Sequence, residues 1–228
     1  MPLTLHSETK HVEGGKRIGS ALVSVYHKAG LEAFVRELHR LEVRIYSTGG
    51  TQEFIEGLGV PVTAVEDLTS DPSILGGRVK TLHPVIHAGL LARPTTADME
   101  ELERLGIRPI DLVVVNLYPF EQTIAKADVT DEECIEQIDI GGPTMVRAAA
   151  KKQLFTTLAT DPAQYGQIMS QIHADGCTTR ALRRELAGAA FEKTATYDRE
   201  IANYFARTAQ ENDETATAAE RIFPATLN

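Results

Sequence analysis

The sequence predicts an α/β fold in which a parallel central sheet is flanked by helices and followed by a C-terminal helical extension. Short apolar runs alternate with amphipathic helical patterns through the first third of the chain, the order that a parallel sheet with crossover helices requires. Residues 110–116 are rich in β-branched side chains, as expected of a strand buried on both faces. Residues 178–205 then form one long helical pattern.

The first three predicted strands are separated by two predicted helices. The apolar run at residues 20–25 predicts the first strand, and residues 43–46 and 61–65 predict the next two. Apolar residues recur at helical spacing over residues 28–40, and a second helix passes through residues 54–58. This strand–helix alternation favours parallel pairing.

The middle of the chain contains a long predicted loop. Residues 66–82 have no periodicity and include a proline and a glycine pair, and long loops inside compact domains are often functional. Helical patterns cover residues 83–92 and 97–105 and lead to the strand at 110–116. The remaining elements are a helix over 129–137 with the capping-box pair Thr130 and Glu133, a helix with Pro143 near its first position, a strand over 154–159 and a helix capped by Asp161.

The chain divides into three predicted regions. Residues 1–19 are polar and predict a flexible leader, residues 20–207 form the folded domain, and residues 208–228 predict a linker-like tail rich in Ala, Thr and Glu. The last residues turn apolar again, which suggests the start of a further domain.

Composition narrows the function classes. The net charge of −9 argues against general nucleic-acid binding, because an acidic surface repels phosphate backbones. Cys134 and Cys177 lie in no CxxC pair, which favours reduced thiols. No apolar stretch approaches the ~20 residues of a membrane span, and the first residues lack a signal-peptide centre. We therefore expect a cytoplasmic protein with no membrane partner.

Two groups of residues follow strands and predict an anion site. In STGGT, residues 47–51, glycines let backbone N–H groups converge on a phosphate at a helix start, although the same pattern also fits an ordinary tight turn. Lys28 follows the first strand at the same carboxyl edge, where open α/β sheets bind ligands, although a solvated lysine is the simpler interpretation.

The loop GGRVKTLHP, residues 76–84, concentrates donors in an acidic protein. Arg78 offers a planar donor fork and Lys80 a mobile ammonium, with Thr81 and His83 beside them, which favours an anionic ligand. His83 and His87 are four residues apart and would suit a metal pair, but no acidic third ligand or HExxH pattern accompanies them. We therefore expect no metal.

Further polar residues flank the later elements. Asn116 and Tyr118 follow the strongest strand, where Asn can contact a base and Tyr can donate a proton, although a cap and a packed ring explain them equally. Asp139 precedes the Gly141–Gly142 pair at a helix start, where it could be a cap, and Lys151 lies twelve residues further on, where basic residues are common.

Together these motifs identify a resemblance. SVYHKAGL, STGGT, GGRVKTLHP, HAGLLAR, NLYPF and EQIDIGGPTMVRAAAK resemble, in order and spacing, the IMP cyclohydrolases, and in particular the N-terminal half of the bifunctional AICAR transformylase/IMP cyclohydrolases. The resemblance runs from about Ser20 to Phe205. It implies a methylglyoxal synthase-like fold, a reaction from FAICAR to IMP plus water without a cofactor, a homodimer, and a transformylase domain that the full-length protein could carry.

The resemblance also implies site residues. The catalytic positions of the family fall on Lys80, Tyr118, Asp139 and Lys151. The nucleotide contacts fall on Ser24, Tyr26, His27, Lys28, Thr48, Gly49, Gly50, Thr51, Arg78, Val79, Thr81, Asn116, Ile140 and Gly141. Tyr26 and His27 stand where relatives often carry Ser and Asp, and Lys152 stands where Asn is frequent.

These roles lead to a mechanistic expectation and two alternatives. Asp139 would deprotonate the carboxamide, Lys80 with the Gly141–Gly142 N–H groups would hold the developing oxyanion, and Lys151 and Tyr118 would pass protons to the departing water. A methylglyoxal synthase-type lyase needs only a phosphate cradle and a carboxylate base. A regulatory nucleotide-binding domain would bind IMP or UMP without turnover.

Overall fold

The computed structural model describes residues 13–220, with side chains described as far as residue 209. The chain forms two compact units. The first, here called the sheet unit, comprises Met1–Leu117 and Asp139–Lys193, and the second, here called the helical unit, comprises Tyr118–Ile138 and Thr194–Asn228. Each is described separately.

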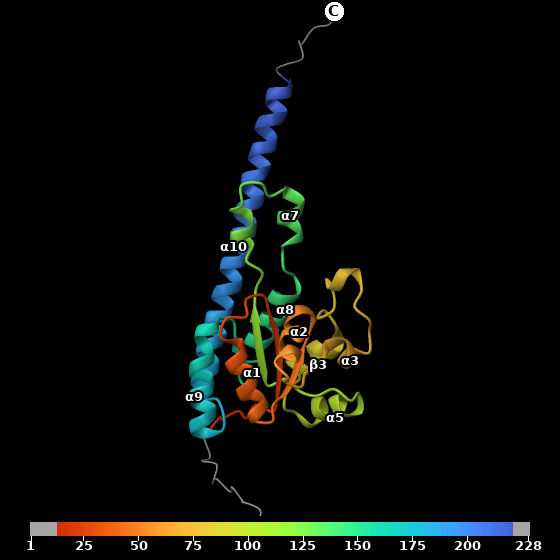
Figure 1. Ribbon diagram of the computed structural model, residues 1–228, viewed down its shortest axis with the longest axis vertical. Helices are drawn as coiled ribbons and strands as arrows, with labels where there is room; N and C mark the ends of the chain where they lie inside the picture. Colours follow the sequence, from red (N-terminus) through yellow and green to blue (C-terminus); the bar gives the residue numbers. More distant parts are fainter. Residues whose placement is uncertain (1–12, 221–228) are drawn as a thin grey trace, which may run out of the picture. The chain divides into compact units, whose positions relative to one another are not determined.

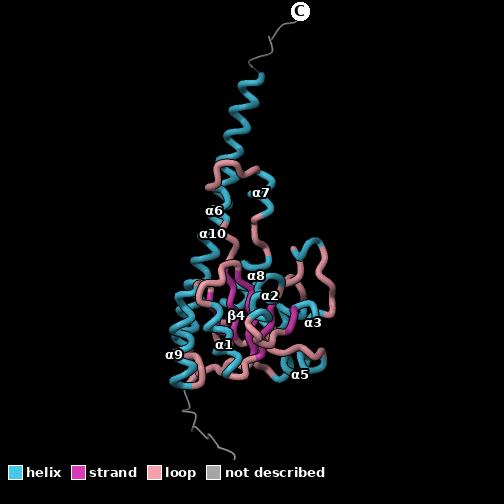
Figure 2. The backbone as a smooth tube through the Cα atoms, in the orientation of Figure 1, coloured by secondary structure: helices cyan, strands magenta, loops and turns pink. Residues whose placement is uncertain are grey.

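The sheet unit is built on five parallel strands in the order β3-β2-β1-β4-β5. Figure 2 shows these strands in magenta among the helices. The strands are β1 (Ser20–Val25), β2 (Arg44–Ser47), β3 (Thr63–Ala64), β4 (Leu112–Asn116) and β5 (Thr157–Ala159). The parallel sheet flanked by helices is therefore confirmed. After β3 the chain returns to the other side of β1, so β1 and β4 are neighbours at a switch point of the topology.

Helices connect the strands of this unit (Figure 1). They are α1 (Leu31–Arg40), α2 (Gly49–Gly57), α3 (Val65–Thr69), α4 (Pro84–Leu91), α5 (Thr96–Arg104), α8 (Gly141–Lys151), α9 (Tyr165–Asp175) and the start of α10 (Arg180–Glu220), with 3-10 turns η1 (Leu75–Gly77) and η2 (Pro162–Gln164). One apolar cluster joins alternate residues of β1 and β4 to the buried faces of α1 and α9, and it includes the stacked rings of Phe34 and Tyr165.

Three elements differ from expectation. β3 has two residues instead of five, and the predicted loop at 66–82 contains α3 and η1. β5 begins at Thr157 because the N–H groups of Phe155 and Thr156 still bond back to the carbonyl of Lys152 after α8. The two strands are shorter than apolar periodicity predicts, since α3 already begins at Val65 and a hydrogen-bonded turn after α8 includes Phe155 and Thr156.

The helical unit contains α6 (Phe120–Ile124), α7 (Asp131–Glu136) and the part of α10 from Thr194 onward. Thr130 and Glu133 form the predicted capping box at the start of α7. Tyr204 donates a hydrogen bond to Asp131, and the ring of Phe120 makes edge contacts with Tyr197 and Tyr204.

The two ends of the chain also differ from expectation. Residues 1–12 and 221–228 of the predicted leader and tail lie outside the described residues. Within the leader, Lys16 pairs with Thr178 and its ammonium lies 2.7 Å from Asp111, so this part is anchored to the sheet unit. The tail was expected to be linker-like from residue 208, but α10 continues to Glu220, because Ala, Glu and Gln favour helix. None of the described helices is both long enough and apolar enough to traverse a bilayer.

Candidate active site

The site begins at the switch point, where Asn116 joins the ends of β1 and β4. Its side-chain oxygen accepts hydrogen bonds from the N–H groups of Tyr26, at 2.6 Å, and His27, at 3.1 Å. Its amide nitrogen donates to the carbonyl of His27 at 2.8 Å. Asn116 therefore holds the turn that leads to Lys28, and most of its hydrogen-bonding capacity is used within the protein.

The STGGT turn forms the start of α2. Gly49 has φ 52°, a left-handed conformation that glycine adopts without steric cost. The Thr51 hydroxyl is buried and exchanges hydrogen bonds with the backbone of Val25, so it fastens α2 to β1. The N-cap residue Thr48 is 4% exposed, and its hydroxyl has no partner among the described residues. Thr48 is therefore the better candidate of the two threonines for contacting a ligand.

The ammonium of Lys80 lies directly over this turn. A Cβ atom built on Gly49 would be 2.8 Å from Lys80 Nζ, so glycine leaves the space that the lysine occupies. Lys80 also passes close to Gly77 of its own loop. Lys80 and the N–H groups at the α2 start are both groups that favour an anion such as a phosphate.

Thr81, the next residue of the same loop, contacts the start of α8. A Cβ atom on Gly141 would lie 2.6 Å from the Thr81 hydroxyl oxygen, so the two chain segments are in close contact. Asp139 accepts a hydrogen bond from the N–H of Gly142 at 2.8 Å, and a Cβ on Gly142 would collide with that carboxylate. The helix N-terminus stabilises the Asp139 anion. The Lys80–Thr81 segment thus contacts both the glycine turn at the start of α2 and the start of α8, where the Asp139 carboxylate lies.

The other predicted nucleotide contacts lie near this edge with differing exposure. Ser24 is half-buried near the end of β1, and the rings of exposed Tyr26 and His27 meet edge to face. Arg78 is exposed and donates to the carbonyl of Leu75, while Val79 is half-buried. Ile140 is 59% exposed at the start of α8. Gly50 follows Gly49 in the first turn of α2.

Lys151 and Tyr118, two of the predicted catalytic residues, are not among the sheet-unit residues that gather around Lys80 and Asp139. Lys151 is exposed at the last position of α8, and ten residues of helical rise separate it from Gly141 by roughly 15 Å. Tyr118 is 46% exposed and belongs to the helical unit.

His83 and His87 lie in different environments at α4. His83 accepts a hydrogen bond from the N–H of Val85 as the N-cap of α4, and its Nε2 lies 2.7 Å from Asp71. Burial lowers the pKa of His87 below its usual range, and its Nε2 is buried without a hydrogen-bond partner among the described residues. Among the residues that the structure describes, no three His, Cys, Asp or Glu side chains gather as a metal site would require.

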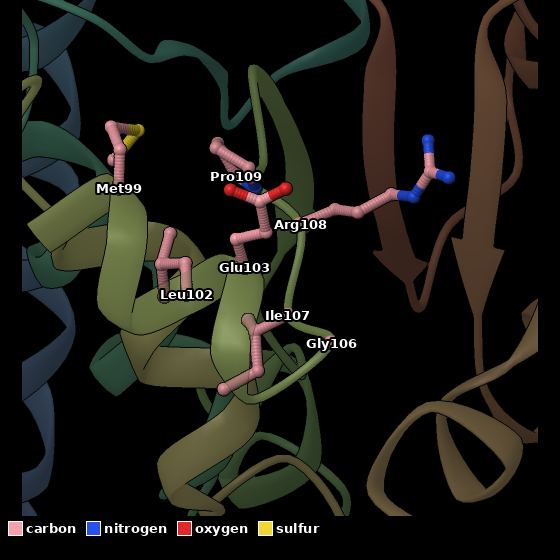
Figure 3. Close-up of a pocket in the computed structure, with 7 residues that line it drawn as sticks. All are labelled: Met99, Leu102, Glu103, Gly106, Ile107, Arg108 and Pro109. Atoms are coloured by element: carbon pink, nitrogen blue, oxygen red, sulfur yellow. The ribbon is translucent and has the colours of Figure 1, made fainter.

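A separate pocket lies between α5 and the segment that leads into the amino end of β4 (Figure 3). It is lined by Met99, Leu102, Glu103, Gly106, Ile107, Arg108 and Pro109. It contains none of the predicted site residues. It lies near the amino end of β4, whereas Asn116 is at the carboxyl end of that strand.

Sequence reasoning missed one feature of the sheet unit. Arg183 is 2% exposed and donates hydrogen bonds to several backbone carbonyls, although its spacing in a helical pattern resembles that of a surface residue.

Comparisons with known proteins agree with this architecture. Residues 30–144 match the family described as MGS-like domain, and residues 149–225 match the family described as AICARFT/IMPCHase bienzyme. The protein named bifunctional purine biosynthesis protein PurH from Listeria monocytogenes serotype 4b (strain CLIP80459) is 52% identical over 185 residues, which cover 81% of this chain and 36% of that protein. The PurH of Bacillus subtilis (strain 168) is 48% identical over 197 residues, covering 86% of this chain and 38% of that protein.

A solved structure is also similar. The crystal structure of ForH superposes with a TM-score of 0.73 at 33% identity, covering 82% of this chain and 99% of that one. The chain thus spans a little over a third of the length of its curated relatives, 36% and 38% of the two described here, but nearly all of this solved chain.

Proposed function

The chain belongs to the MGS-like domain family and to the AICARFT/IMPCHase family, and on that premise we propose that it is an IMP cyclohydrolase that converts FAICAR to IMP and water. The observation that carries the proposal is the position of the Lys80–Thr81 segment. Lys80 lies over the Gly49 turn and Thr81 contacts Gly141, so one loop links an anion-binding turn to the Asp139 carboxylate.

The reaction requires a base and an oxyanion donor. The carboxamide nitrogen of FAICAR attacks the formyl carbon and loses a proton as the C–N bond forms, and the formyl oxygen becomes negative. Asp139 accepts that proton, and the Lys80 ammonium donates a hydrogen bond to the oxygen. The oxygen is then protonated and leaves as water, while the formamido nitrogen loses its proton and the ring becomes conjugated.

The structure modifies the expected donor set. The N–H of Gly142 already donates to Asp139, so we assign the oxyanion chiefly to Lys80 rather than to both glycine N–H groups. The ionised Asp139 remains oriented by that bond and by the helix start. Tyr118 stays a sequence-based prediction as a proton donor to the leaving oxygen. Lys151 stays a sequence-based prediction for the same proton transfers.

Turnover of FAICAR, followed by the absorbance change on IMP formation, tests the proposal. Lys80→Ala should reduce kcat by about 10²–10³, as loss of one oxyanion donor does. Asp139→Asn should reduce it by about 10²–10⁴, as loss of a general base does. Arg104→Ala removes an exposed charge from α5 and serves as the control, with turnover unchanged.

Three outcomes would contradict the assignment. Near-full turnover by both Lys80→Ala and Asp139→Asn would exclude these roles. Turnover of dihydroxyacetone phosphate with none of FAICAR would indicate a lyase of the methylglyoxal synthase type. Binding of IMP or UMP without turnover would indicate a regulatory domain. The homodimer, the cytoplasmic location and a covalently joined transformylase domain remain predictions from the sequence.

A further inference from the structure

Residues 71–83, here called the 71–83 loop, run from the end of α3 to the start of α4 and carry Lys80 and Thr81. Figure 1 shows this loop as the yellow chain that follows α3. Its two ends meet, because Oδ2 of Asp71 lies 2.7 Å from Nε2 of His83. One side-chain contact therefore closes the loop at its base, and the proposed catalytic steps use neither of these residues.

Each partner of this contact is anchored to a helix. The N–H of Asp71 donates to the hydroxyl of Thr69, the last residue of α3, at 3.3 Å. His83 is the N-cap of α4, where its Nδ1 accepts a hydrogen bond from the N–H of Val85 at 3.2 Å. The contact thus joins the end of α3 to the start of α4, and the loop leaves and returns at two points that are held together.

The two bonds of His83 also fix the orientation of its ring. Because Nδ1 accepts from Val85, the proton of the neutral ring is on Nε2, which donates it to the Asp71 carboxylate. Both ring nitrogens therefore have partners, and the ring cannot rotate without losing both bonds. The contact does not require a positive charge on the imidazole.

The backbone bonds within the loop are local. The N–H groups of Gly77, Arg78 and Lys80 each bond to the carbonyl three residues back. Those bonds shape the loop but attach it to no other element. The Lys80 ammonium nevertheless lies in the space above Gly49. Since a lysine side chain has many rotamers, the place that its ammonium reaches depends on where the backbone is held.

We propose that Asp71 and His83 are positioning residues, whose contact holds the 71–83 loop at its base and so keeps the Lys80 ammonium over the Gly49 turn. Neither side chain touches a reacting atom. The Asp71 side chain is 63% exposed and that of His83 is 26% exposed, so the pair stabilises the loop modestly, as partly exposed pairs do. The kinetic consequence rests on the proposed function, whereas the constraint on the loop needs no substrate.

Turnover of FAICAR provides the first test. Asp71→Ala removes the acceptor, and we expect kcat/KM to fall about threefold to fivefold, the upper part of the range for a partly exposed pair. Asp71→Asn keeps an oxygen that can accept from Nε2, so it should stay within about 1.5-fold of the wild type. The exposed Asp67→Ala on α3 is the matched control and should retain full kcat/KM. An equal loss in Asp71→Asn and Asp71→Ala would overturn the proposal.

The variant His83→Asn separates the two bonds of the ring. Asparagine is a preferred N-cap, so its side-chain oxygen can replace Nδ1 as the acceptor for Val85, but the shorter side chain does not reach Asp71. His83→Asn should therefore lower kcat/KM as much as Asp71→Ala, and the double variant should lose no more than either single variant. Losses that multiply in the double variant would contradict the proposal. The exposed His39→Asn on α1 is the control and should keep wild-type turnover.

A Lys80→Ala background tests whether the effect passes through Lys80. In that background Asp71→Ala should cost less than about 1.5-fold in kcat/KM, since the group that the contact positions is gone. An undiminished loss would show that Asp71 acts by another route and would overturn the proposal.

Cleavage by trypsin after Arg78 or Lys80 tests the constraint without substrate. At low protease concentration the cleavage rate follows the population of the opened loop. Asp71→Ala and His83→Asn should be cleaved about threefold to fivefold faster than the wild type, and Asp67→Ala at the wild-type rate. Unchanged cleavage of the first two variants would overturn the proposal. If the wild-type protein does not turn over FAICAR, the proposed function fails, and the cleavage rates still decide the role of the pair.

Discussion

At the scale of single residues, the glycines and the polar groups of the candidate site form matched pairs. Gly49 leaves room for Lys80, Gly141 for Thr81 and Gly142 for Asp139, and in each pair a Cβ atom would occupy or closely approach the position of the polar group. The glycines therefore do more than permit turns. They set how closely a loop and two helix starts approach one another.

This pairing makes Gly49 a sensitive position. In Gly49→Ala the methyl group would lie within 2.8 Å of the present position of Lys80 Nζ, and the positive φ adds strain. Because the lysine terminus is mobile, we expect displacement of the ammonium, with kcat reduced by about tenfold or more. The free energy of unfolding should fall by about 1 kcal/mol, the cost of alanine in a left-handed conformation.

Gly57→Ala is the matched control for Gly49→Ala. Gly57 ends the same helix, has an ordinary φ, and a Cβ there meets nothing within 4 Å. Its turnover should equal that of the wild type in steady-state assays. Equal losses in the two variants would show that α2 tolerates no added methyl and would remove the special role of Gly49.

At the scale of elements, Arg183 of α10 joins segments that are distant in sequence. Its guanidinium donates to the carbonyls of Gln153 and Leu154 before β5 and of Gly14 near the start of the described chain. It also donates to Thr178 just before its own helix. A planar group with several fixed donors suits this arrangement, which an ammonium matches poorly.

Loss of this guanidinium should destabilise the fold. Arg183→Met leaves several buried carbonyls without a donor, so we expect the free energy of unfolding to fall by about 3 kcal/mol or more. Arg183→Lys should recover only part of that loss. Urea unfolding measures both, with the neighbouring exposed Arg184→Met as a control expected to change stability by less than about 0.5 kcal/mol. A change below about 1 kcal/mol in Arg183→Met would contradict this account.

At the scale of the whole molecule, stability should depend on pH through ion pairs between helices. Glu37 on α1 contacts Arg40 on the same helix and His173 on α9. Hydrogen bonds from Arg40 and His173 lower the pKa of Glu37 from 4.5 to about 2. A carboxyl with a depressed folded-state pKa contributes stability above its unfolded value, and that contribution is lost as pH falls toward the folded value.

We therefore expect Glu37→Gln to flatten the pH dependence of stability between about pH 4.5 and about pH 2. Urea midpoints measured across this range test the expectation. The exposed Glu53→Gln on α2 is the control and should keep the wild-type slope. A Glu37→Gln slope equal to that of the wild type would show that the α1–α9 contact carries no net stabilisation in solution, as is common for exposed pairs.

Much of the fold follows from local patterns in the sequence. Apolar runs located β1, β2 and β4, helical spacing located α1, α4 and α5, and the Thr130–Glu133 pair marked the start of α7. Asp161 marked the helical segment that begins with η2 and continues into α9. Local signals fail where hydrogen-bonded turns replace a strand, as after Lys152, and where a composition typical of a linker still favours helix, as after Arg207. The motifs also predicted Lys80, Thr48 and Asp139 as site residues, because glycine turns and isolated donors form a recognisable pattern.

The sequence by itself determined the fold class, the family resemblance and the types of groups that the site would contain. Only the tertiary structure decided which partner each group contacts. In the structure, Thr51 and Asn116 form hydrogen bonds with backbone groups at the end of β1. Lys80 lies over Gly49, and Lys151 is separated from Gly141 by the length of α8. The physical reason is that a hydrogen-bonding group has few partners, and which partner it meets depends on contacts between segments distant in the chain.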